Sequence, residues 1–313
     1  MATFDVVISR PGQVNNTGDA YALNLKQFGG ETLTEFERIT VFKDKHFTRS
    51  ISGGRSAQFP YIGTANAIYK TPGTSLDGQT IAGAEKVITI DGLLTSSVSI
   101  EDIEEAMMHY DIRGPYAEAL GRALAYMYDA NVARCMVLGA RATSPITGRP
   151  GGTRIINTNI GTDGAVLEDA IWTASQTFDQ NDVPMEGRRA FFRPIQYNLL
   201  ARRTNLVSKD FGDGGNLAKG SLPTVANIDL VKSNHVPNTD QSALTSILPK
   251  YRANYAATRG IIATEMAAAT VQLMGMSMES DYEVRHQGTF VVAKYAVGHD
   301  WLRPDCAIEL ATA

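Results

Sequence analysis

The stretch that decides the fold runs from Val41 to Ala142 and contains Glu85-Lys-Val-Ile-Thr-Ile-Asp-Gly-Leu-Leu-Thr-Ser-Ser-Val-Ser-Ile100. The alternation of apolar and polar residues in this segment predicts one β-strand. The preceding arm, Val41–Tyr69, is rich in aromatic and β-branched residues and is predicted as the other arm of a hairpin. Between the arms, Thr71–Ala84 has glycine turns and almost no apolar content, which predicts a loop that is mobile in an isolated subunit. Arms this long outrun the sheet of any single domain, so we expect a second subunit to supply the missing surface.

Two helices are predicted to follow the hairpin. Ser99 precedes a cluster of acidic residues, which predicts a helix start because side-chain oxygens cap free backbone N–H groups and acids suit the positive end of the helix dipole. We expect this helix to run to about Tyr110. Gly114-Pro115 then breaks it, and proline suits the first turn of a new helix. Apolar residues at helical spacing continue to Gly139 and predict a helix over 115–139, about 36 Å long.

The rest of the chain is predicted to mix helices and strands. Residues 1–30 form an arm that we expect to order only against another surface, and a short helix follows at Glu31–Arg38. The elements predicted in the second half are a strand at Thr153–Ile156, a helix at Ala165–Phe178, a strand at Arg189–Phe192, a helix at Pro194–Arg202, and strands at Ile228–Val231, Gly260–Ala263, Val271–Met276, Tyr282–His299 and Ala307–Ala311, with Gln287–Val297 as a long β run between turn signals.

Composition narrows the function classes. A length of 313 residues predicts about two domains, and 43% hydrophobic with 20% charged residues is typical of a folded protein. A net charge of −4 argues against gripping nucleic acid through the chain's own charge, since that requires an excess of lysine and arginine. Neither a signal peptide nor an apolar run of about 18 residues is visible, so we expect a soluble, cytosolic chain without a membrane partner.

No residue pattern points to catalysis, a metal or a cofactor. Cys135 and Cys306 lack a partner motif and are predicted to be buried free thiols, and the five histidines show no metal-binding spacing. The glycine-rich stretches Ser52–Ser56 and Asp210–Gly215 match no phosphate-binding motif. We therefore expect no catalytic residues, metal or cofactor. The enzyme alternative that stays open is a cytosolic α/β enzyme with a site at Asp210–Gly215 and His235.

Charge is distributed unevenly around the hairpin. From Val41 to Gly83, five basic residues against two acidic ones give +3, and from Glu85 to Glu105 six acidic residues against one lysine give −5. These segments are either ordinary solvated faces or the two sides of a contact between subunits. In the second case, opposite charges would fix the register of the contact rather than supply most of its affinity. The candidate contact residues are Lys43, Lys45, Arg49, Arg55 and Lys70 on the hairpin, with Glu101, Asp102, Glu104 and Glu105 at the helix start.

Several blocks of sequence occur in an order typical of one family. The blocks are Phe28–Phe36, Arg49–Pro60, Glu85–Leu94, Asp102–Met107 with His109–Asp111, and Ala293–His299 with Leu302–Pro304. In these blocks the chain resembles the major capsid proteins of short-tailed bacteriophages of the T-seven-like group. Residues 143–280 match that family in outline only, and this region is shorter than we expect for it.

The resemblance implies the tailed-phage, or Hong Kong 97-type, capsid fold of the α+β class. The parts that it implies are an N-terminal arm at 1–40, an extended loop at 41–84, a peripheral domain at 85–159 and 275–303 with a spine helix at 115–139, and an axial α/β domain at 160–274 and 304–313. The tail after Pro304 is expected to return to the axial sheet.

The function that the resemblance implies is structural. Such a protein self-assembles into hexamers and pentamers of an icosahedral head around double-stranded DNA, which it contacts without sequence-specific binding. Implied partners are further copies of the chain, with a scaffolding protein and a portal during assembly in the host cytoplasm, and maturation of the procapsid would move the loop and arm. Quasi-equivalent packing requires hinges, which we place at Gly53, Gly54, Gly92, Gly114 and Pro115. An encapsulin-like compartment holding cargo protein is a further alternative.

Overall fold

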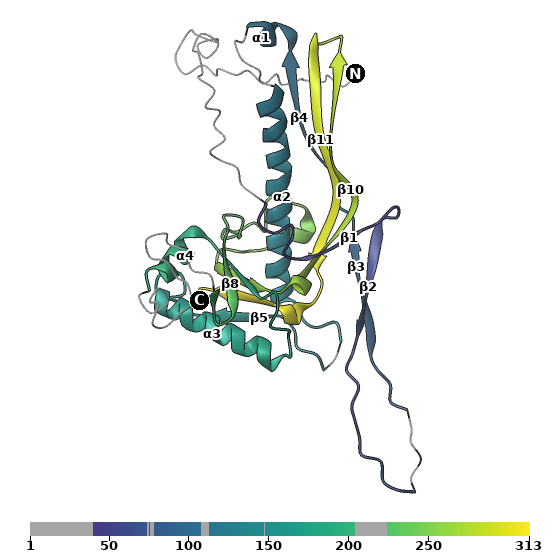
Figure 1. The fold of residues 1–313 in the computed structure, drawn as a ribbon, viewed down its shortest axis with the longest axis vertical. Helices are drawn as coiled ribbons and strands as arrows, with labels where there is room; N and C mark the ends of the chain where they lie inside the picture. Colours follow the sequence, from purple (N-terminus) through teal and green to yellow (C-terminus); the bar gives the residue numbers. More distant parts are fainter. Residues whose placement is uncertain (1–39, 74, 76–77, 108–112, 147, 204–223) are drawn as a thin grey trace. The chain divides into compact units, whose positions relative to one another are not determined.

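The computed structural model describes residues 40–73, 75, 78–107, 113–146, 148–203 and 224–313 (Figure 1). The predicted arm at 1–30, the helix at Glu31–Arg38 and the stretch Asp210–Gly215 lie outside these residues. The described chain divides into two compact units. The first comprises Thr40, Asp91–Tyr128 and Leu273–Val297, and the second comprises Val41–Ile90, Asp129–Gln272 and Gly298–Ala313.

The described residues form four α-helices and twelve strands. The helices are α1 (Asp102–Met107), α2 (Arg113–Arg141), α3 (Gly164–Gln180) and α4 (Pro194–Ala201). The strands are β1 (Phe47–Ser50), β2 (Ser56–Ile62), β3 (Gly83–Thr89), β4 (Gly92–Glu101), β5 (Thr153–Ile156), β6 (Arg189–Phe192), β7 (Thr224–Val225), β8 (Ile228–Lys232), β9 (Thr258–Ala263), β10 (Ala268–Glu283), β11 (Gly288–Trp301) and β12 (Ala307–Ala311). Short 3-10 turns lie at η2 (Pro249–Tyr251), η3 (Glu265–Ala267) and η4 (Pro304–Cys306).

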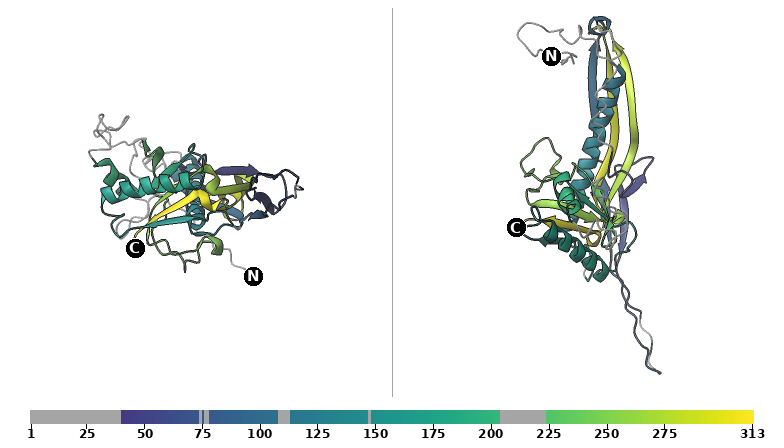
Figure 2. Two further views of the ribbon diagram at one scale, coloured as in Figure 1. Left: turned by 90° about the horizontal axis from the view of Figure 1, so that it is seen from below. Right: turned by 60° about the vertical axis from the view of Figure 1, so that its left-hand side comes forward.

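The first unit is a long antiparallel ribbon with a helix beside it. Strand β4 pairs with β11 along its whole length, and β10 lies on the other side of β11. The N-terminal part of α2 runs beside β4 and β11 in both views (Figure 1, Figure 2). Leu120 and Leu124, one helical turn apart, pack on Ala293 of β11. This contact buries the apolar stripe of α2 that the sequence predicts.

The second unit is built on a six-stranded mixed sheet in the order β5-β12-β9-β6-β8-β7. Helices α3 and α4 pack on each other, and α4 lies against β6 and β8. The strands are buried because they are continuous apolar runs, such as Ala190–Phe192 and Ile261–Ala263. In the same unit β1 pairs in parallel with the start of β10, and β2 pairs with β3 as a two-stranded hairpin.

The predicted hairpin arms are wrong in extent. The return arm is two strands, since the chain breaks at Asp91-Gly92 and β3 and β4 belong to different sheets. Gly92 has φ of +123°, a conformation that glycine adopts without steric cost. The first arm ends as a strand at Ile62, not Tyr69, and its β1 segment pairs with β10 instead of the return arm.

Most other predicted elements are confirmed, with three exceptions. The helix predicted to start after Ser99 begins only at Asp102, because Ser99–Glu101 belong to β4, and its predicted end near Tyr110 lies outside the described residues. The strand predicted at Val271–Met276 is part of the longer β10. Helix α2 extends the predicted helix by two residues at each end, and β5, β6 and β12 have the predicted bounds. Helices α3 and α4 and strands β8 and β9 agree within two residues, and β12 joins the six-stranded sheet as expected for the tail. The single strand predicted at Tyr282–His299 is wrong, because a turn at 284–287 separates β10 from β11.

A buried carboxylate ties the end of α2 to the sheet of the second unit. Glu309 on β12 is fully buried and accepts hydrogen bonds from Arg141 at 2.5 and 2.7 Å, from Arg154 at 2.8 Å and from Thr258 at 2.6 Å. Burial alone would raise the pKa of Glu309, but the bonds from Arg141 and Thr258 and the charge of Arg154 hold it below its usual value. One carboxylate thereby connects α2, β5, β9 and β12.

Replacing this carboxylate should destabilise the second unit. We expect Glu309→Gln to lower its free energy of unfolding by roughly 2–4 kcal/mol, because Arg141 and Arg154 lose their counter-charge but are partly hydrated. Chemical denaturation at pH 7 measures the loss. Since folding lowers the pKa of Glu309, the difference should be present above pH 4.5 and disappear as the pH falls through the folded-state pKa. The exposed Glu186→Gln is the control, and equal effects of both variants would contradict the prediction.

Candidate assembly surface

The base of the β2–β3 hairpin packs on its own unit. Alternate residues of β2 are buried, and Ala57 and Phe59 pack with Ile88, Val271 and Leu302. The expectation that the hairpin has nothing in its own domain to rest on is therefore wrong for its base. The period-two alternation of β2 gives the hairpin one apolar face, and β10 supplies the surface that covers it.

Three basic side chains stabilise the base of the β2–β3 hairpin. The Lys86 ammonium lies 3.0 Å from Asp300 and 3.5 Å from the centre of the Trp301 ring. The Tyr61 ring lies 5.6 Å from the Arg149 guanidinium and 5.9 Å from that of Arg303. Cation–π contacts of this kind contribute about 0.5–2 kcal/mol each. The hairpin is anchored before any second chain is present.

Beyond its base the hairpin continues into a loop that its own chain leaves uncovered. Every described residue from Thr64 to Ala82 is exposed. Gln79 holds the two sides of the loop together, because its amide accepts from Asn66 N at 3.0 Å and donates to Asn66 O at 2.7 Å. Ile68 is 75% exposed and Tyr69 is fully exposed. Large apolar side chains left uncovered on a projecting loop are typical of an interaction surface.

The five predicted basic residues differ in exposure and in the contacts that they make within their own chain. Lys43, Arg55 and Lys70 are exposed. Arg49 is also exposed, but it donates to Gln58 O at 3.2 Å and lies 5.6 Å from the Phe59 ring, so it also stabilises its own hairpin. Lys45 is half-buried, and burial followed by the charge of Arg189 lowers its pKa. Lys45 is therefore the least available of the five.

The predicted acidic partners belong to the first unit. Glu101 and Asp102 are half-buried where β4 runs into α1, and Asp102 accepts a hydrogen bond of 2.7 Å from the Tyr282 hydroxyl. Glu104 and Glu105 lie in α1, but their side chains are outside the described part of the structure. A single chain does not bring these acids to the basic residues of a neighbour, so the contact between subunits stays a prediction.

The predicted hinges lie at junctions between elements. Gly53 and Gly54 connect β1 to β2; Gly53 has open space around it, and Gly54 has φ of +100°. Gly92 opens β4, while Gly114 and Pro115 lie in the first turn of α2. Their positions suit a change of direction, and their action as hinges stays a prediction.

Comparison with known proteins places the chain in a family. Residues 58–311 match the family of Gp10A-like major capsid proteins. The chain belongs to this family. It is 34% identical over 319 aligned positions to the major capsid protein of Escherichia phage T7, covering 93% of this chain and 92% of the relative. The capsid structure of cyanophage P-SCSP1u matches with a TM-score of 0.84 and 42% identity over 99% of each chain.

The mature capsid of bacteriophage PhiM1 shares only the fold, with a TM-score of 0.78 at 16% identity over 92% of each chain. These matches confirm the resemblance to T-seven-like capsid proteins and the Hong Kong 97-type α+β fold. The capsid protein is a structural component of the virion and not an enzyme. The matches give no support to the encapsulin-like or enzyme alternatives. The domain boundaries stay a prediction.

The residues of the enzyme alternative form no site in the described capsid protein. His235 is buried with Nε2 3.9 Å from the Asp129 carboxylate, and Asp210–Gly215 is not described. Cys135 and Cys306 are buried free thiols as predicted, and burial raises the pKa of Cys306 to about 11. Within the described ranges, no three metal-ligating side chains gather, and no helix is long and apolar enough to cross a membrane.

Asp129 lies where the described chain begins. Sequence periodicity places it on the polar face of α2, yet it is buried and accepts from Val41 N at 2.6 Å and Phe42 N at 3.4 Å. Burial raises the pKa of Asp129 to about 6, against the lowering effect of those two bonds. The carboxylate holds the backbone at Val41 and Phe42 against α2. Nothing local in the sequence could reveal this contact across 88 residues.

Two buried histidines form a second connection that sequence reasoning missed. His46 Nδ1 must donate to Phe42 O at 2.6 Å, because a carbonyl only accepts. In neutral His46, Nε2 therefore accepts from the Thr270 hydroxyl at 2.6 Å, and Thr270 in turn accepts from His299 Nδ1 at 2.8 Å. Burial lowers the pKa of both rings, so both are neutral at pH 7. The chain of bonds joins the β1 region to β10 and β11.

Breaking this chain of bonds should destabilise the capsid protein. Thr270→Val keeps the shape of the side chain but removes the hydroxyl between His46 and His299. We expect the free energy of unfolding at pH 7.5 to fall by roughly 1–3 kcal/mol, measured by urea denaturation, because buried ring nitrogens lose their partner.

The same bonds predict a pH dependence with a definite sign. The pKa values of His46 and His299 are lower in the folded state, so their contribution should be complete above pH 6.5 and be lost as the pH falls through the folded-state pKa values. His286→Gln is the control, since His286 lies on a turn beside Glu283. The raised pKa of Asp129 acts in the opposite direction between pH 7 and 5, so the measurement is made in an Asp129→Asn background. There, an unfolding midpoint that rises on acidification from pH 7 to 5 would contradict the assignment.

Proposed function

We propose that this capsid protein assembles into the hexamers and pentamers of an icosahedral phage head through its β2–β3 hairpin and loop. The head would enclose double-stranded DNA without sequence-specific binding, as suits a net charge of −4. The observation that carries the proposal is the exposed loop from Thr64 to Ala82 on an anchored base. Membership of the capsid family accounts for an oligomeric shell, and the loop accounts for how neighbours hold together.

Burial of the loop against a neighbour would release apolar surface from water. Ile68 and Tyr69 are largely uncovered and Ile81 is 46% exposed in the described structure. Fully burying one such side chain contributes about 1.5–3 kcal/mol. A few residues per contact, repeated around a shell, are sufficient for stable association. Because the base is already anchored, little ordering of the hairpin opposes this gain.

Opposite charges would determine where the loop binds on the adjacent subunit. The exposed Arg55 and Lys70 would face the acids Glu101 and Asp102 of the adjacent subunit, and this arrangement would reject shifted registers. During assembly, a scaffolding protein and a portal would be further partners, and procapsid maturation would turn the hairpin at Gly53-Gly54. The family resemblance supports these roles.

Protection of the loop on assembly is a direct test. In the free subunit, trypsin should cleave readily after Lys70, which is exposed in a segment without strand pairing. In assembled particles the same cleavage should slow by about tenfold or more, because the neighbour covers the loop. Mass spectrometry of timed digests measures both rates. Lys86, held by Asp300 and Trp301, should resist cleavage in both states, and equal cleavage at Lys70 in both would contradict the proposal.

Charge reversal on the hairpin tests its role in register. We expect Arg49→Glu with Arg55→Glu to leave a soluble, folded subunit that fails to form particles in negative-stain micrographs. Arg55→Glu alone is the cleaner variant, because Arg49 also contacts Gln58 and Phe59 of its own hairpin. Arg202→Glu, an exposed reversal outside the hairpin, is the control. Normal particles from the double variant would refute the charge hypothesis.

A further inference from the structure

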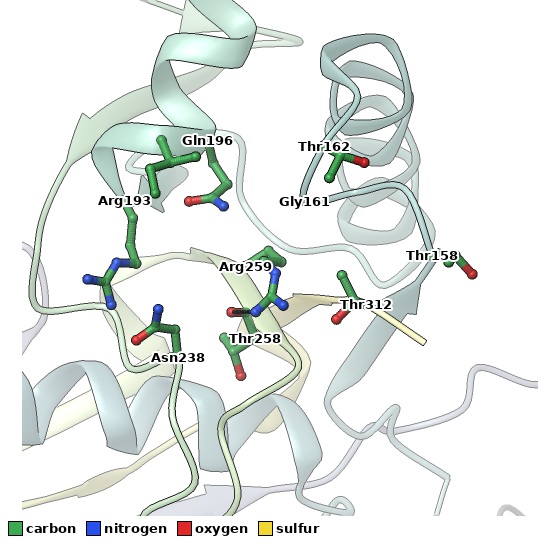
Figure 3. Close-up of a pocket in the computed structure, with 10 residues that line it drawn as sticks. Thr158, Gly161, Thr162, Arg193, Gln196, Asn238, Thr258, Arg259 and Thr312 are labelled. Carbon is green, nitrogen blue, oxygen red and sulfur yellow. Dashed lines mark hydrogen bonds between the residues drawn. The ribbon is translucent and has the colours of Figure 1, made fainter.

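A polar cleft of about 520 Å³ lies in the second unit between α4, β9 and the loop before α3 (Figure 3). Arg193, Gln196, Asn238 and Arg259 point into or line it. Among the described residues around this cleft none is acidic. Among the described residues, the cleft therefore concentrates two positive charges and two amides without an anion.

The donors of the cleft are only partly used. Arg193 donates to Val236 O at 3.4 Å, and Arg259 donates through Nη1 to two backbone carbonyls at 2.8 and 3.0 Å. Each guanidinium carries five N–H donors, and neither forms an ion pair within the described ranges. Gln196 is 7% exposed, and its side-chain oxygen has no hydrogen-bond partner there. The Gln196 oxygen is an acceptor and does not bind an anion. The two guanidinium forks suit a carboxylate, which arginine binds through parallel hydrogen bonds.

The same unit presents a complementary surface on α3. Asp169, Trp172, Gln176 and Asp179 follow helical spacing along the outer face and line a second shallow cleft of about 510 Å³. Trp172 is 57% exposed. Asp179 pairs with Arg188, whereas the Asp169 carboxylate has no partner among the described residues. Tryptophan is enriched among the residues that carry most of the binding energy of protein interfaces.

We propose that these clefts are two halves of one contact, in which Asp169 of one copy enters the Arg193–Arg259 cleft of the next and Trp172 covers its rim. The inference rests on the proposed shell function and names a contact within it. The clefts share no residue, so the contact is heterologous, the kind of contact from which rings of subunits are built when the rotation between copies closes. Tryptophan over a guanidinium adds a cation–π attraction.

A second copy fits the cleft better than nucleic acid does. Binding to a phosphate backbone uses rows of surface cations, but the cleft holds two arginines and no lysine. The chain carries 33 acidic residues against 29 basic ones, so every neighbouring copy supplies carboxylates. Charge complementarity therefore selects a carboxylate of an identical subunit.

Charge exchange on the full chain tests the contact. Arg193→Glu and Asp169→Lys are each expected to fold, checked by circular dichroism, but to reduce the protein found in particles by about tenfold or more. Combining both changes in one chain should restore particles to within about threefold of wild type. A 1:1 mixture of the two single variants should restore six-membered rings, because alternating subunits then pair opposite charges at every contact. Arg202→Glu, at the other end of α4, is the control.

Each outcome decides between the alternatives. Wild-type assembly by both folded single variants would overturn the contact and leave the proposed function standing, as would a double variant or mixture no better than either single variant. If Arg193→Glu does not fold, Asp169→Lys still tests the contact, because the Asp169 carboxylate makes no bond to another described residue. A wild-type chain that forms no oligomer would contradict the shell function and this contact together.

Discussion

The burial of one face of the β2–β3 hairpin on its own unit is the contact on which the rest of the assembly surface depends. Phe59 and Ile88 pack under β10, and Lys86 fastens the edge. This fixes the start of the loop in one place. The loop itself loses the period-two alternation, and its described residues from Thr64 to Ala82 are all exposed. An anchored base with an uncovered end is a geometry that favours binding to a neighbour.

Buried polar groups join segments that lie far apart in sequence. Glu309 of β12 connects the end of α2 with strands β5 and β9, and Thr270 connects His46 with His299. Such groups contribute modestly to stability when paired, but they disfavour other arrangements strongly because an unpaired partner remains buried. Exposed charges such as Arg55 have no such role within the subunit. Because the buried polar groups are paired within the subunit, the exposed charges stay available for contacts between copies.

The sequence and the structure agree best where a pattern is local. Helix α2 follows from its apolar spacing and from the proline at its start, and β6 follows from a short buried run next to a proline. The return arm was wrongly predicted as one strand, and the reason is physical. Alternation continues through Asp91-Gly92 without a change of period, so nothing local shows that β3 and β4 enter different sheets. The basic residues were identifiable, but the contacts of Lys45 and Arg49 within their own chain were not.

By itself, the sequence determined the long helix, most strands of the six-stranded sheet, the family and the charged segments of the hairpin, because spacing, composition and motif order are properties of contiguous residues. Only the tertiary structure decided that β1 pairs with β10, that Asp129 and Glu309 are buried, and that the Arg193–Arg259 cleft lacks an anion. Each of these depends on residues tens to hundreds of positions apart, whose proximity is set by packing and not by local pattern.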